Sequence, residues 1–292
     1  FPFAHETGFN FPKKKVLEFT KDIVSGNSDK IFHNAMYDVG WLRQAGVDVK
    51  GRVIDTMVVA PLINENMYWY TLNALGIEYL QEGKSEAELR QAAEEWGIDP
   101  KAEMWRLPSA YVGTYATQDA ALTLKLWNHF KILLEEQNLW NIFELETNLF
   151  PVLFNMKTTG VRVDLDRAAQ LKKQLIVEQK KITREVVKES GVKEVRVWAA
   201  KSVAKVFDAC KIPYNQTAKG NPSFTKAFLA NQEHPVAKKI MKIRELDKAH
   251  STFIDTIVKH AHNGRIHADI RQLKGETGGT VTGRLSMSNP NL

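Results

Sequence analysis

The pattern of hydrophobic and polar positions changes between the two halves of the chain. In the first half, short β-branched runs such as "VKGRVIDTMVVAPL" (49–62) alternate with segments of helical periodicity such as "YATQDAALTLKLWNHFKILLEE" (115–136). Short apolar runs mixed with amphipathic helices are typical of a sheet covered by helices. We therefore expect an α/β fold for this half.

The second half is mostly helical in its pattern. The segment "NIFELETNLFPVLFNMKTTG" (141–160) predicts a long helix that Pro151 bends and Gly160 ends. A short strand, an aspartate cap and a helix with a basic exposed face follow over residues 161–190. After a loop-rich stretch around "TAKGNPSFT" (217–225), residues 234–262 are helical again, and the last thirty residues return to strand and turn.

Charge divides the chain in the same way. Residues 1–150 hold 14 Lys and Arg against 21 Asp and Glu, a net charge of −7, whereas residues 151–292 hold 26 against 13, a net charge of +13. This asymmetry predicts an acidic module joined to one that faces a polyanion, most often nucleic acid. Solvated lysine-rich helices are the alternative, and charge alone does not separate the two.

Length and composition limit the remaining possibilities. A chain of 292 residues favours two or three domains, and one cysteine, Cys210, excludes an internal disulfide framework and suits a reducing cytoplasm. No apolar run approaches the roughly 18 residues of a membrane span, so we expect no membrane partner. Because the first residue is Phe1 rather than methionine, we expect the chain to be part of something longer.

Two pairs of polar residues could carry chemistry. "FHNAMYDVGWL" (32–42) places Asn34 and Asp38 four residues apart, and "YVGTYATQDAALTL" (111–124) repeats that spacing with Tyr115 and Asp119. On a helix, residues four apart share a face. Hydrolysis of a phosphodiester by two metal ions needs carboxylates that converge from different elements, and Tyr115 could orient the attacking water. Either pair taken alone is more often a surface aspartate or a half-buried tyrosine.

Other polar clusters predict less. His260, His262 and His267 lack partner residues at the usual spacing of a zinc site, so we expect a solvent-facing strand and turn there. "GETGG" (275–279) lacks the Gly-Lys-Ser/Thr ending of a phosphate-binding loop. The spacing in "RELDKAHST" puts four side chains along one helical side where they could contact DNA phosphates, or simply face solvent: Arg244, Lys248, Ser251 and Thr252.

Taken together, the motifs resemble a known family. Asn-x-x-x-Asp followed some eighty residues later by Tyr-x-x-x-Asp resembles the second and third motifs of the proofreading 3′–5′ exonucleases, and "VIDTMVVAPLINEN" resembles that family's strand and helix, with Asp55 in place. "GETGGTVTGRLSMSNPNL" (275–292) looks like the approach to the palm of family A (DNA polymerase I-like) DNA polymerases. The stretch 219–254 looks like the thumb of that family, closest to its phage branch.

The resemblance runs along the whole chain and implies an architecture. It implies an α/β ribonuclease H-like exonuclease domain over residues 1–140, without its first strand, then a linker helix and mainly helical thumb over 141–262, and the first strands of a polymerase palm over 263–292. The implied activity is DNA-directed DNA synthesis (a nucleotidyltransferase) with 3′–5′ proofreading in DNA replication, including viral DNA replication, both reactions using Mg²⁺. The implied partners are primer-template DNA, a single-stranded DNA 3′ end and deoxynucleoside triphosphates, in the cytoplasm of a bacterium or phage-infected cell.

Two departures from the family pattern affect the expected activity. No Asp-x-Glu, the first exonuclease motif, precedes Asn34, and Glu6 lies too close to serve. The polymerase's metal-binding aspartates would follow Leu292. The resemblance therefore leaves Asp38 and Asp119 as the metal ligands, Tyr115 beside them and Asn34 as a contact to DNA, and we expect the chain alone to show little nuclease activity.

The resemblance also gives the last residues a role. Minor-groove acceptors occupy similar positions in every correct base pair, so an arginine held there tests pairs without reading sequence. Arg284 is implied in that role, with further DNA contacts from Lys274, Thr282, Asn289 and Asn291. Otherwise these residues build a turn in which Arg284 pairs with a carboxylate.

Two other functions stay open from the sequence. One is a stand-alone 3′–5′ exoribonuclease of the same superfamily with a helical nucleic-acid-binding tail. The other is a non-catalytic DNA-binding module with a decayed exonuclease fold. The terminal "TGRLSMSNPNL" disfavours the first, and the presence of Asp38, Tyr115 and Asp119 disfavours the second.

Overall fold

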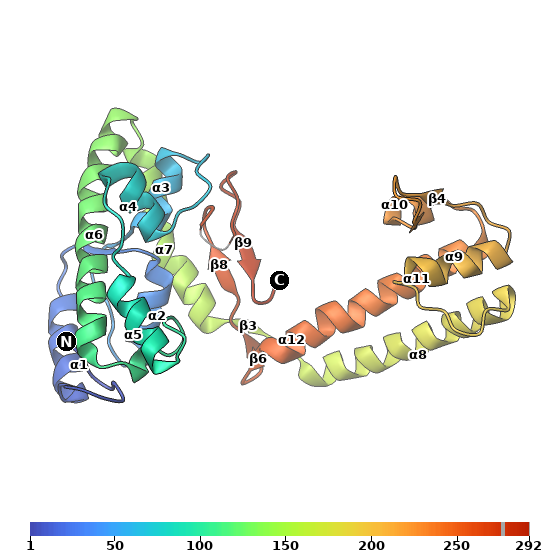
Figure 1. Cartoon of the computed structure of the whole chain (residues 1–292), viewed down its shortest axis with the longest axis horizontal. Helices are drawn as coiled ribbons and strands as arrows, with labels where there is room; N and C mark the ends of the chain where they lie inside the picture. The colour runs from blue at the N-terminus through green and yellow to red at the C-terminus, as the bar shows by residue number, and fades with distance from the viewer. Residues whose placement is uncertain (276–277, 292) are drawn as a thin grey trace. The chain divides into compact units, whose positions relative to one another are not determined.

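The computed structural model describes residues 1–275 and 278–291, and the chain divides into two compact units (Figure 1). The first unit comprises Phe1–Thr159 with Ala268–Leu292, and the second comprises Gly160–His267. The long helix after residue 140 and the C-terminal strands thus belong to the same unit as the α/β half. The boundaries expected at residues 140 and 262 stay predictions.

The first unit consists of helices around a short parallel sheet. Its elements are α1 (Lys13–Val24), β1 (Lys30–Phe32), α2 (Ala35–Gln44), β2 (Val53–Asp55), α3 (Thr56–Ile63), α4 (Leu72–Leu80), α5 (Ala87–Trp96), the single-turn η1 (Met104–Arg106), α6 (Ser109–Glu136), α7 (Trp140–Thr159), β8 (Asp269–Arg271) and β9 (Ser286–Ser288). The alternation of short strands and helices confirms the α/β pattern expected of this half.

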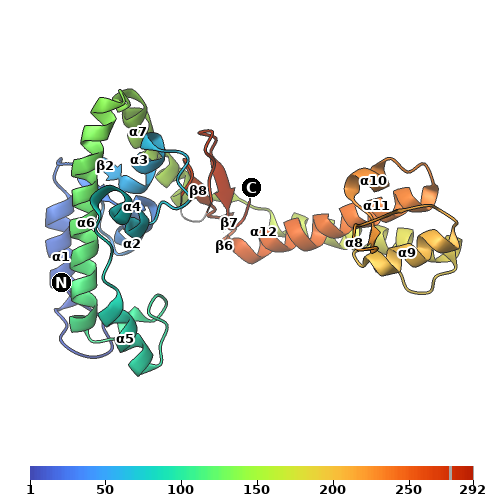
Figure 2. The same ribbon diagram turned by 45° about the horizontal axis from the view of Figure 1, so that its top comes forward.

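The core of this unit forms around the long helix α6. Its buried positions include Leu122, Leu126, Phe130 and Leu134, whose spacing of four residues places them on one face. That face packs against Ile54 of β2 and against α3 and α4, which lie beside α6 in both views (Figures 1 and 2). The packing fixes the part of α6 that precedes Leu122, which is where Tyr115 and Asp119 lie.

The parallel strands bring two polar segments to one edge. β1 pairs with β2 in a register that sets Phe32 opposite Asp55. Both strands therefore end at the same edge, where the chain continues into Asn34 on one side and into α3 on the other. The strand and helix expected from "VIDTMVVAPLINEN" are confirmed.

Strand β8 packs against α7 and pairs with β9. Strands β8 and β9 are antiparallel, and Lys157 of α7 forms a 2.7 Å ion pair with Asp269. The buried amide of Gln272 donates to the main-chain oxygen and to the carboxylate of Glu146, each at 2.8 Å. These contacts satisfy polar groups that would be costly to bury alone.

The second unit is built on a pair of long helices. Its elements are β3 (Val161–Arg162), α8 (Leu165–Ser190), α9 (Ala200–Ala209), β4 (Asn215–Gln216), β5 (Pro222–Ser223), α10 (Lys226–Ala230), α11 (Pro235–Asp247), the π-helical η2 (Lys248–Ile254), α12 (Asp255–His260), β6 (Ala261–His262) and β7 (Arg265–Ile266). Helix α8 packs against α11, and a core that includes Val186, Phe207 and Ile240 joins them to α9 (Figure 2).

Several local expectations hold where the chain passes from the first unit into the second. Helix α7 contains Pro151 and ends at Thr159, and Gly160 follows with a φ of +69°. A side chain there would lie 2.7 Å from the main-chain oxygen of Ile266, so the close pairing of β3 with β7 needs glycine. Asp164 caps α8 by accepting from the N–H of Arg167 at 2.8 Å. Over the described residues, no helix is both long and apolar enough to cross a membrane.

Candidate active site

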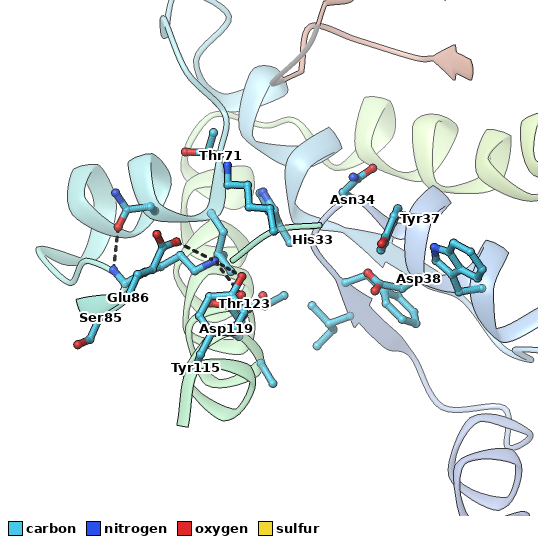
Figure 3. Close-up of a pocket in the computed structure, with 18 of the residues that line it drawn as sticks. His33, Asn34, Tyr37, Asp38, Thr71, Ser85, Glu86, Tyr115, Asp119 and Thr123 are labelled. Carbon is cyan, nitrogen blue, oxygen red and sulfur yellow. Dashed lines mark hydrogen bonds and ion pairs between the residues drawn. The ribbon is translucent and has the colours of Figure 1, made fainter. Parts of the chain in front are cut away.

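A cleft of about 1550 Å³ in the first unit is lined by all four residues of the two sequence motifs. Asn34 and Asp38 come from the start of α2, and Tyr115 and Asp119 come from α6. Figure 3 shows the first pair and Tyr37 on one side, and the second pair on the other. We call these sides the α2 wall and the α6 wall.

The start of the α2 wall is held in place by hydrogen bonds to the carboxylate of Asp55. This carboxylate is 8% exposed and accepts from the N–H groups of Asn34 at 2.8 Å, Ala35 at 2.7 Å and Met57 at 2.9 Å. It therefore ties the start of α2 to the start of α3. Asn34 precedes α2 in a left-handed conformation with a φ of 70°, so the helical spacing expected of it does not apply, although it still lines the same cleft as Asp38. Asparagine tolerates that conformation better than most residues.

Both aspartates beneath and within this wall have raised pKa values. Burial raises the pKa of Asp55 to about 6, while its three main-chain donors act in the opposite direction by favouring the charged form. Burial and, to a lesser extent, the nearby charge of Asp55 together raise the pKa of Asp38 to about 6. A divalent cation beside Asp38 would reverse this effect by stabilising the carboxylate.

Two large aromatic side chains are exposed on the α2 wall. Tyr37 is 60% exposed and Trp41 is 61% exposed, and both line the cleft. Their ring centroids lie 6.2 Å apart in an edge-to-face arrangement. Exposed aromatic rings beside a cleft of this kind can stack on nucleobases.

The α6 wall holds its carboxylate by an ion pair. Lys84, whose side chain is 11% exposed, lies with its Nζ 2.8 Å from Oδ2 of Asp119 and donates to the Tyr115 hydroxyl at 3.1 Å. Burial alone would lower the pKa of Lys84, but the hydrogen bonds to Asp119 and Tyr115 raise it above its ordinary value, so the ammonium is charged. Within the described residues, Oδ1 of Asp119 is buried and has no hydrogen-bond partner.

These donors fit a divalent cation in part. Carboxylate oxygens suit Mg²⁺, and the unpartnered Oδ1 of Asp119 is a buried acceptor that lacks a donor or cation. Across residues 1–275 and 278–291, however, no three His, Cys, Asp or Glu side chains gather as metal ligands. The cleft thus contains two candidate ligands, Asp38 and Asp119, and their sharing of a metal stays a prediction. His260, His262 and His267 likewise form no such group.

The floor of the cleft carries a neutral histidine. Burial and, to a lesser extent, the charge of Lys84 together lower the pKa of His33 to about 4. Its Nδ1 lies 2.9 Å from the Thr56 hydroxyl, which donates to the main-chain oxygen of Phe32 at 3.1 Å. His33 therefore adds no positive charge to the cleft at neutral pH.

The residues of the second unit that were predicted to contact phosphates differ in their exposure and in their hydrogen bonds. Arg244 on α11 is half-buried, donates to the main-chain oxygens of Val197 and Phe224 at 2.7 Å each, and lies over the Trp198 ring. Burial lowers its pKa. Arg244 thus connects α11 to the segments around Val197 and Phe224. Its contact with DNA stays a prediction.

The other three predicted residues lie on the π-helical segment η2. Lys248, Ser251 and Thr252 are exposed, and the Ser251 hydroxyl donates to the main-chain oxygen of Asp247 at 2.7 Å. Widened turns of this kind occur often at functional sites. Their exposure leaves them accessible to a ligand.

The predicted residues near the C-terminus also differ in setting. Lys274 donates to the main-chain oxygen of Met67 at 2.7 Å, and the amide of Asn289 donates to Asp269 at 3.1 Å. Thr282, Arg284 and Asn291 are exposed. The main-chain oxygen of Arg284 accepts from the Thr280 hydroxyl at 2.7 Å, which closes a turn around Gly283.

Sequence reasoning did not identify three residues of the cleft. Lys84 lies in "QEGKSEAE" (81–88), where nothing separates it from other surface lysines, so only the fold reveals its pairing with Asp119. Trp41 follows Asp38 by three residues, and this helical spacing was a usable signal for a shared face. Tyr37 lies next to Asp38 and would not have been placed in the cleft by spacing alone.

Comparisons with known proteins match both units. Residues 9–135 match the family described as 3′–5′ exonuclease, and residues 165–292 match the family described as DNA polymerase family A. A DNA-directed DNA polymerase of Pseudomonas phage M6 is 32% identical over 306 residues, covering 100% of this chain and 46% of that protein. A DNA polymerase DpoZ of Salmonella phage PMBT28 is 31% identical, covering 94% of this chain and 48% of that protein.

A solved structure shows the same fold. The POL domain of Pol1 from M. smegmatis, in complex with DNA primer-template and dNTP, superposes with a TM-score of 0.72 at 20% identity over 97% of this chain and 45% of that chain. The expected order of an exonuclease domain followed by polymerase segments is confirmed. The chain belongs to DNA polymerase family A, and it spans about half the length of the curated relatives it matches.

Proposed function

We propose that the protein containing this chain is a DNA-directed DNA polymerase whose first unit removes nucleotides from single-stranded DNA 3′ ends. The observation that carries the nuclease part is the presence of Asp38 and Asp119 on the two walls of one cleft, which Tyr115 and exposed aromatic rings also line. The relatives named as polymerases support the synthetic activity. We place it in the cytoplasm of a bacterium or phage-infected cell, which the single cysteine suits.

The chain's residues divide the work of hydrolysis. Two Mg²⁺ ions, when bound, would neutralise the phosphate and lower the pKa of the attacking water. Asp38 and Asp119 would hold them, and the Tyr115 phenol, whose pKa burial raises, would stay protonated and orient the water. Tyr37 and Trp41 would stack on the unpaired bases near the 3′ end. Such stacking accepts any base, as the removal of mismatched ends requires.

The basic second half would hold the primer-template duplex. Its charge of +13 over residues 151–292 favours contacts with phosphates, which neither read sequence nor persist at high salt. The exposed Lys248, Ser251 and Thr252 are proposed phosphate contacts, and Arg284 is proposed to donate to minor-groove acceptors at the primer terminus. The deoxynucleoside triphosphate would be the second substrate of the complete protein.

A crossed experiment on the complete gene product tests this division. Asp38→Asn and Asp119→Asn should each reduce 3′ nucleotide removal from a single-stranded oligonucleotide by roughly 10²-fold or more, because a charge-stabilising group is lost. Primer extension should be unchanged in both variants. Arg284→Ala should instead reduce extension by up to about 10²-fold through misalignment of the primer end, and leave 3′ removal intact.

The exposed Asp48→Asn, outside the cleft, is the matched control and should change neither rate. Full 3′ removal by Asp119→Asn would refute the nuclease assignment. Equal loss of both activities in one variant would indicate a folding defect and refute the division between the units. Faster removal of RNA ends than of DNA ends would favour the exoribonuclease alternative.

A further inference from the structure

We propose that Lys84 is a resident counter-cation of the α6 wall, which holds Asp119 and Tyr115 in place without metal and which a divalent cation must displace from Asp119. The proposal rests on the proposed nuclease function, because it concerns regulation of the same site. It assigns Lys84 as a positioning residue that sets the metal affinity of the cleft.

The contacts of Lys84 differ from those of a surface lysine. Its ammonium contacts Oδ2 of Asp119 at 2.8 Å, donates to the Tyr115 hydroxyl at 3.1 Å and lies 4.5 Å from the centroid of the Tyr115 ring. The ammonium of Lys84 therefore contacts both polar residues of the Tyr-x-x-x-Asp motif, Tyr115 and Asp119. With 11% of its side chain exposed, Lys84 is mostly shielded from solvent, and a charge pair in that setting is screened little by salt.

The backbone around Lys84 is fixed to the same wall. Its N–H donates to the side-chain oxygen of Asn73 at 2.7 Å, and the N–H of Ser85 donates to Gln118 of α6 at 3.0 Å. The Gln118 amide returns a bond to the main-chain oxygen of Gly83 at 3.2 Å. The segment 83–85 is thus bound to helices α4 and α6, and the lysine is directed at Asp119 by the fold.

Electrostatics makes Lys84 and a metal ion alternatives at Asp119. An ammonium and a divalent cation on the same carboxylate would repel each other strongly in a partly buried site. Removing the lysine without replacement leaves the carboxylate of Asp119, whose side chain is 25% exposed, unpaired in a partly buried site, which is unfavourable. Glu86 offers a second acceptor, since its Oε1 lies 3.9 Å from the Lys84 ammonium. A cation that binds Asp119 can therefore displace Lys84 toward Glu86 without leaving its charge unpaired.

Binding of Mn²⁺ to the full chain, followed by its electron paramagnetic resonance signal without DNA, tests the proposal. Lys84→Met should bind Mn²⁺ at least tenfold more tightly than the unchanged protein, and Lys84→Arg should not, because it keeps the cation. Lys125→Met is the matched control: Lys125 pairs with Glu82 at 2.6 Å between the same loop and α6, but at the exposed surface. It should leave Mn²⁺ affinity unchanged.

Amine labelling of the unchanged protein provides a second readout that does not depend on how a variant folds. Addition of Mn²⁺ should raise the acetylation rate of Lys84 severalfold relative to Lys125, measured by mass spectrometry. Equal Mn²⁺ affinity in Lys84→Met and the unchanged protein, or no binding by Lys84→Met, would overturn the proposal, as would unchanged labelling. These measurements involve no hydrolysis, so they test the role of Lys84 separately from the nuclease function. The Lys84 proposal can be wrong while Asp119→Asn still abolishes 3′ removal, and it can be right while Asp119→Asn does not.

Discussion

The two walls of the cleft hold their carboxylates by different means. The α2 wall is organised by hydrogen bonds, because Asp55 gathers three main-chain N–H groups beneath Asp38. The α6 wall is organised by an ion pair between Lys84 and Asp119. The α2 wall therefore keeps its shape without a cation, whereas the α6 wall already contains one.

This difference suggests an unequal response to metal. On the α2 wall the pKa of Asp38 is raised to about 6 by burial and by Asp55, so a cation would relieve an existing electrostatic cost. On the α6 wall a cation would have to replace Lys84. We infer that a divalent cation binds more readily at Asp38 on the α2 wall. Its binding at Asp119 on the α6 wall depends on the displacement of Lys84.

The largest effect should come from removing the support of the α2 wall. Asp55→Ala leaves the N–H groups of Asn34, Ala35 and Met57 without their acceptor. An unsatisfied buried donor costs about 1–3 kcal/mol. The N–H of Ala35 is buried and those of Asn34 and Met57 are partly buried, so we expect a loss of about 3 kcal/mol in the free energy of unfolding, measured with urea. Asp29→Ala, which removes an exposed partner of Arg52, should cost about 1 kcal/mol or less. Similar losses in the two variants would show that Asp55 is not the support of this wall.

Much of the fold could be predicted because it follows from local patterns. The alternation in the first half, the helix through Pro151, the break at Gly160 and the cap at Asp164 each depend on a few neighbouring residues. The pair Tyr115 and Asp119 could be placed on one helix for the same reason. The assignment of the C-terminal strands to the first unit could not, because it depends on distant contacts such as Lys157 with Asp269.

The sequence predicted the acidic residues of the site, but it did not predict the contacts of the basic residues. Each aspartate follows a polar partner by four residues, which is a recognisable pattern. Lys84, by contrast, comes from a loop thirty-odd positions before Asp119, and only packing brings the two together. Arg244 shows the opposite case. Its place among basic residues indicated a phosphate contact, yet its guanidinium donates to two main-chain oxygens, which depends on how α11 packs against distant segments.

A second, intermediate effect should distinguish the walls by their affinity for DNA. Trp41→Ala removes a large exposed ring from the α2 wall. Stacking on one base is worth about 1–3 kcal/mol, so the dissociation constant for a single-stranded oligonucleotide should rise roughly 5- to 150-fold in fluorescence anisotropy with EDTA present. Trp96→Ala, an exposed tryptophan on α5 outside the cleft lining, is the matched control and should have little effect. Equal affinities of Trp41→Ala and Trp96→Ala would exclude stacking on this wall.

The smallest effect concerns the pH dependence of stability and depends on the raised pKa of Asp38. The pKa of an unfolded aspartate is about 3.9, whereas that of Asp38 in the fold is about 6. The folded protein therefore binds this proton more tightly, and ionisation destabilises the fold. The cost is absent below about pH 4, grows as the pH rises to 6 and is complete above that.

Asp38→Asn removes this ionisation with little change of shape, so its stability relative to the unchanged protein should grow with pH. With EDTA present, we expect equal free energies of unfolding near pH 4 and an advantage of roughly 1–2 kcal/mol for the variant at pH 7.5, reduced from the full shift because Asp38 is partly exposed. Asp119→Asn should show the opposite sign at pH 7.5, because it leaves Lys84 without its carboxylate. An advantage for Asp38→Asn that does not change with pH would show that the charge of Asp38 is not what destabilises the α2 wall. If Asp119→Asn instead raised the free energy of unfolding at pH 7.5, the two walls would not differ in this way. Lys84 would then not compensate the charge of Asp119, and both aspartates would destabilise the fold in the absence of a metal ion.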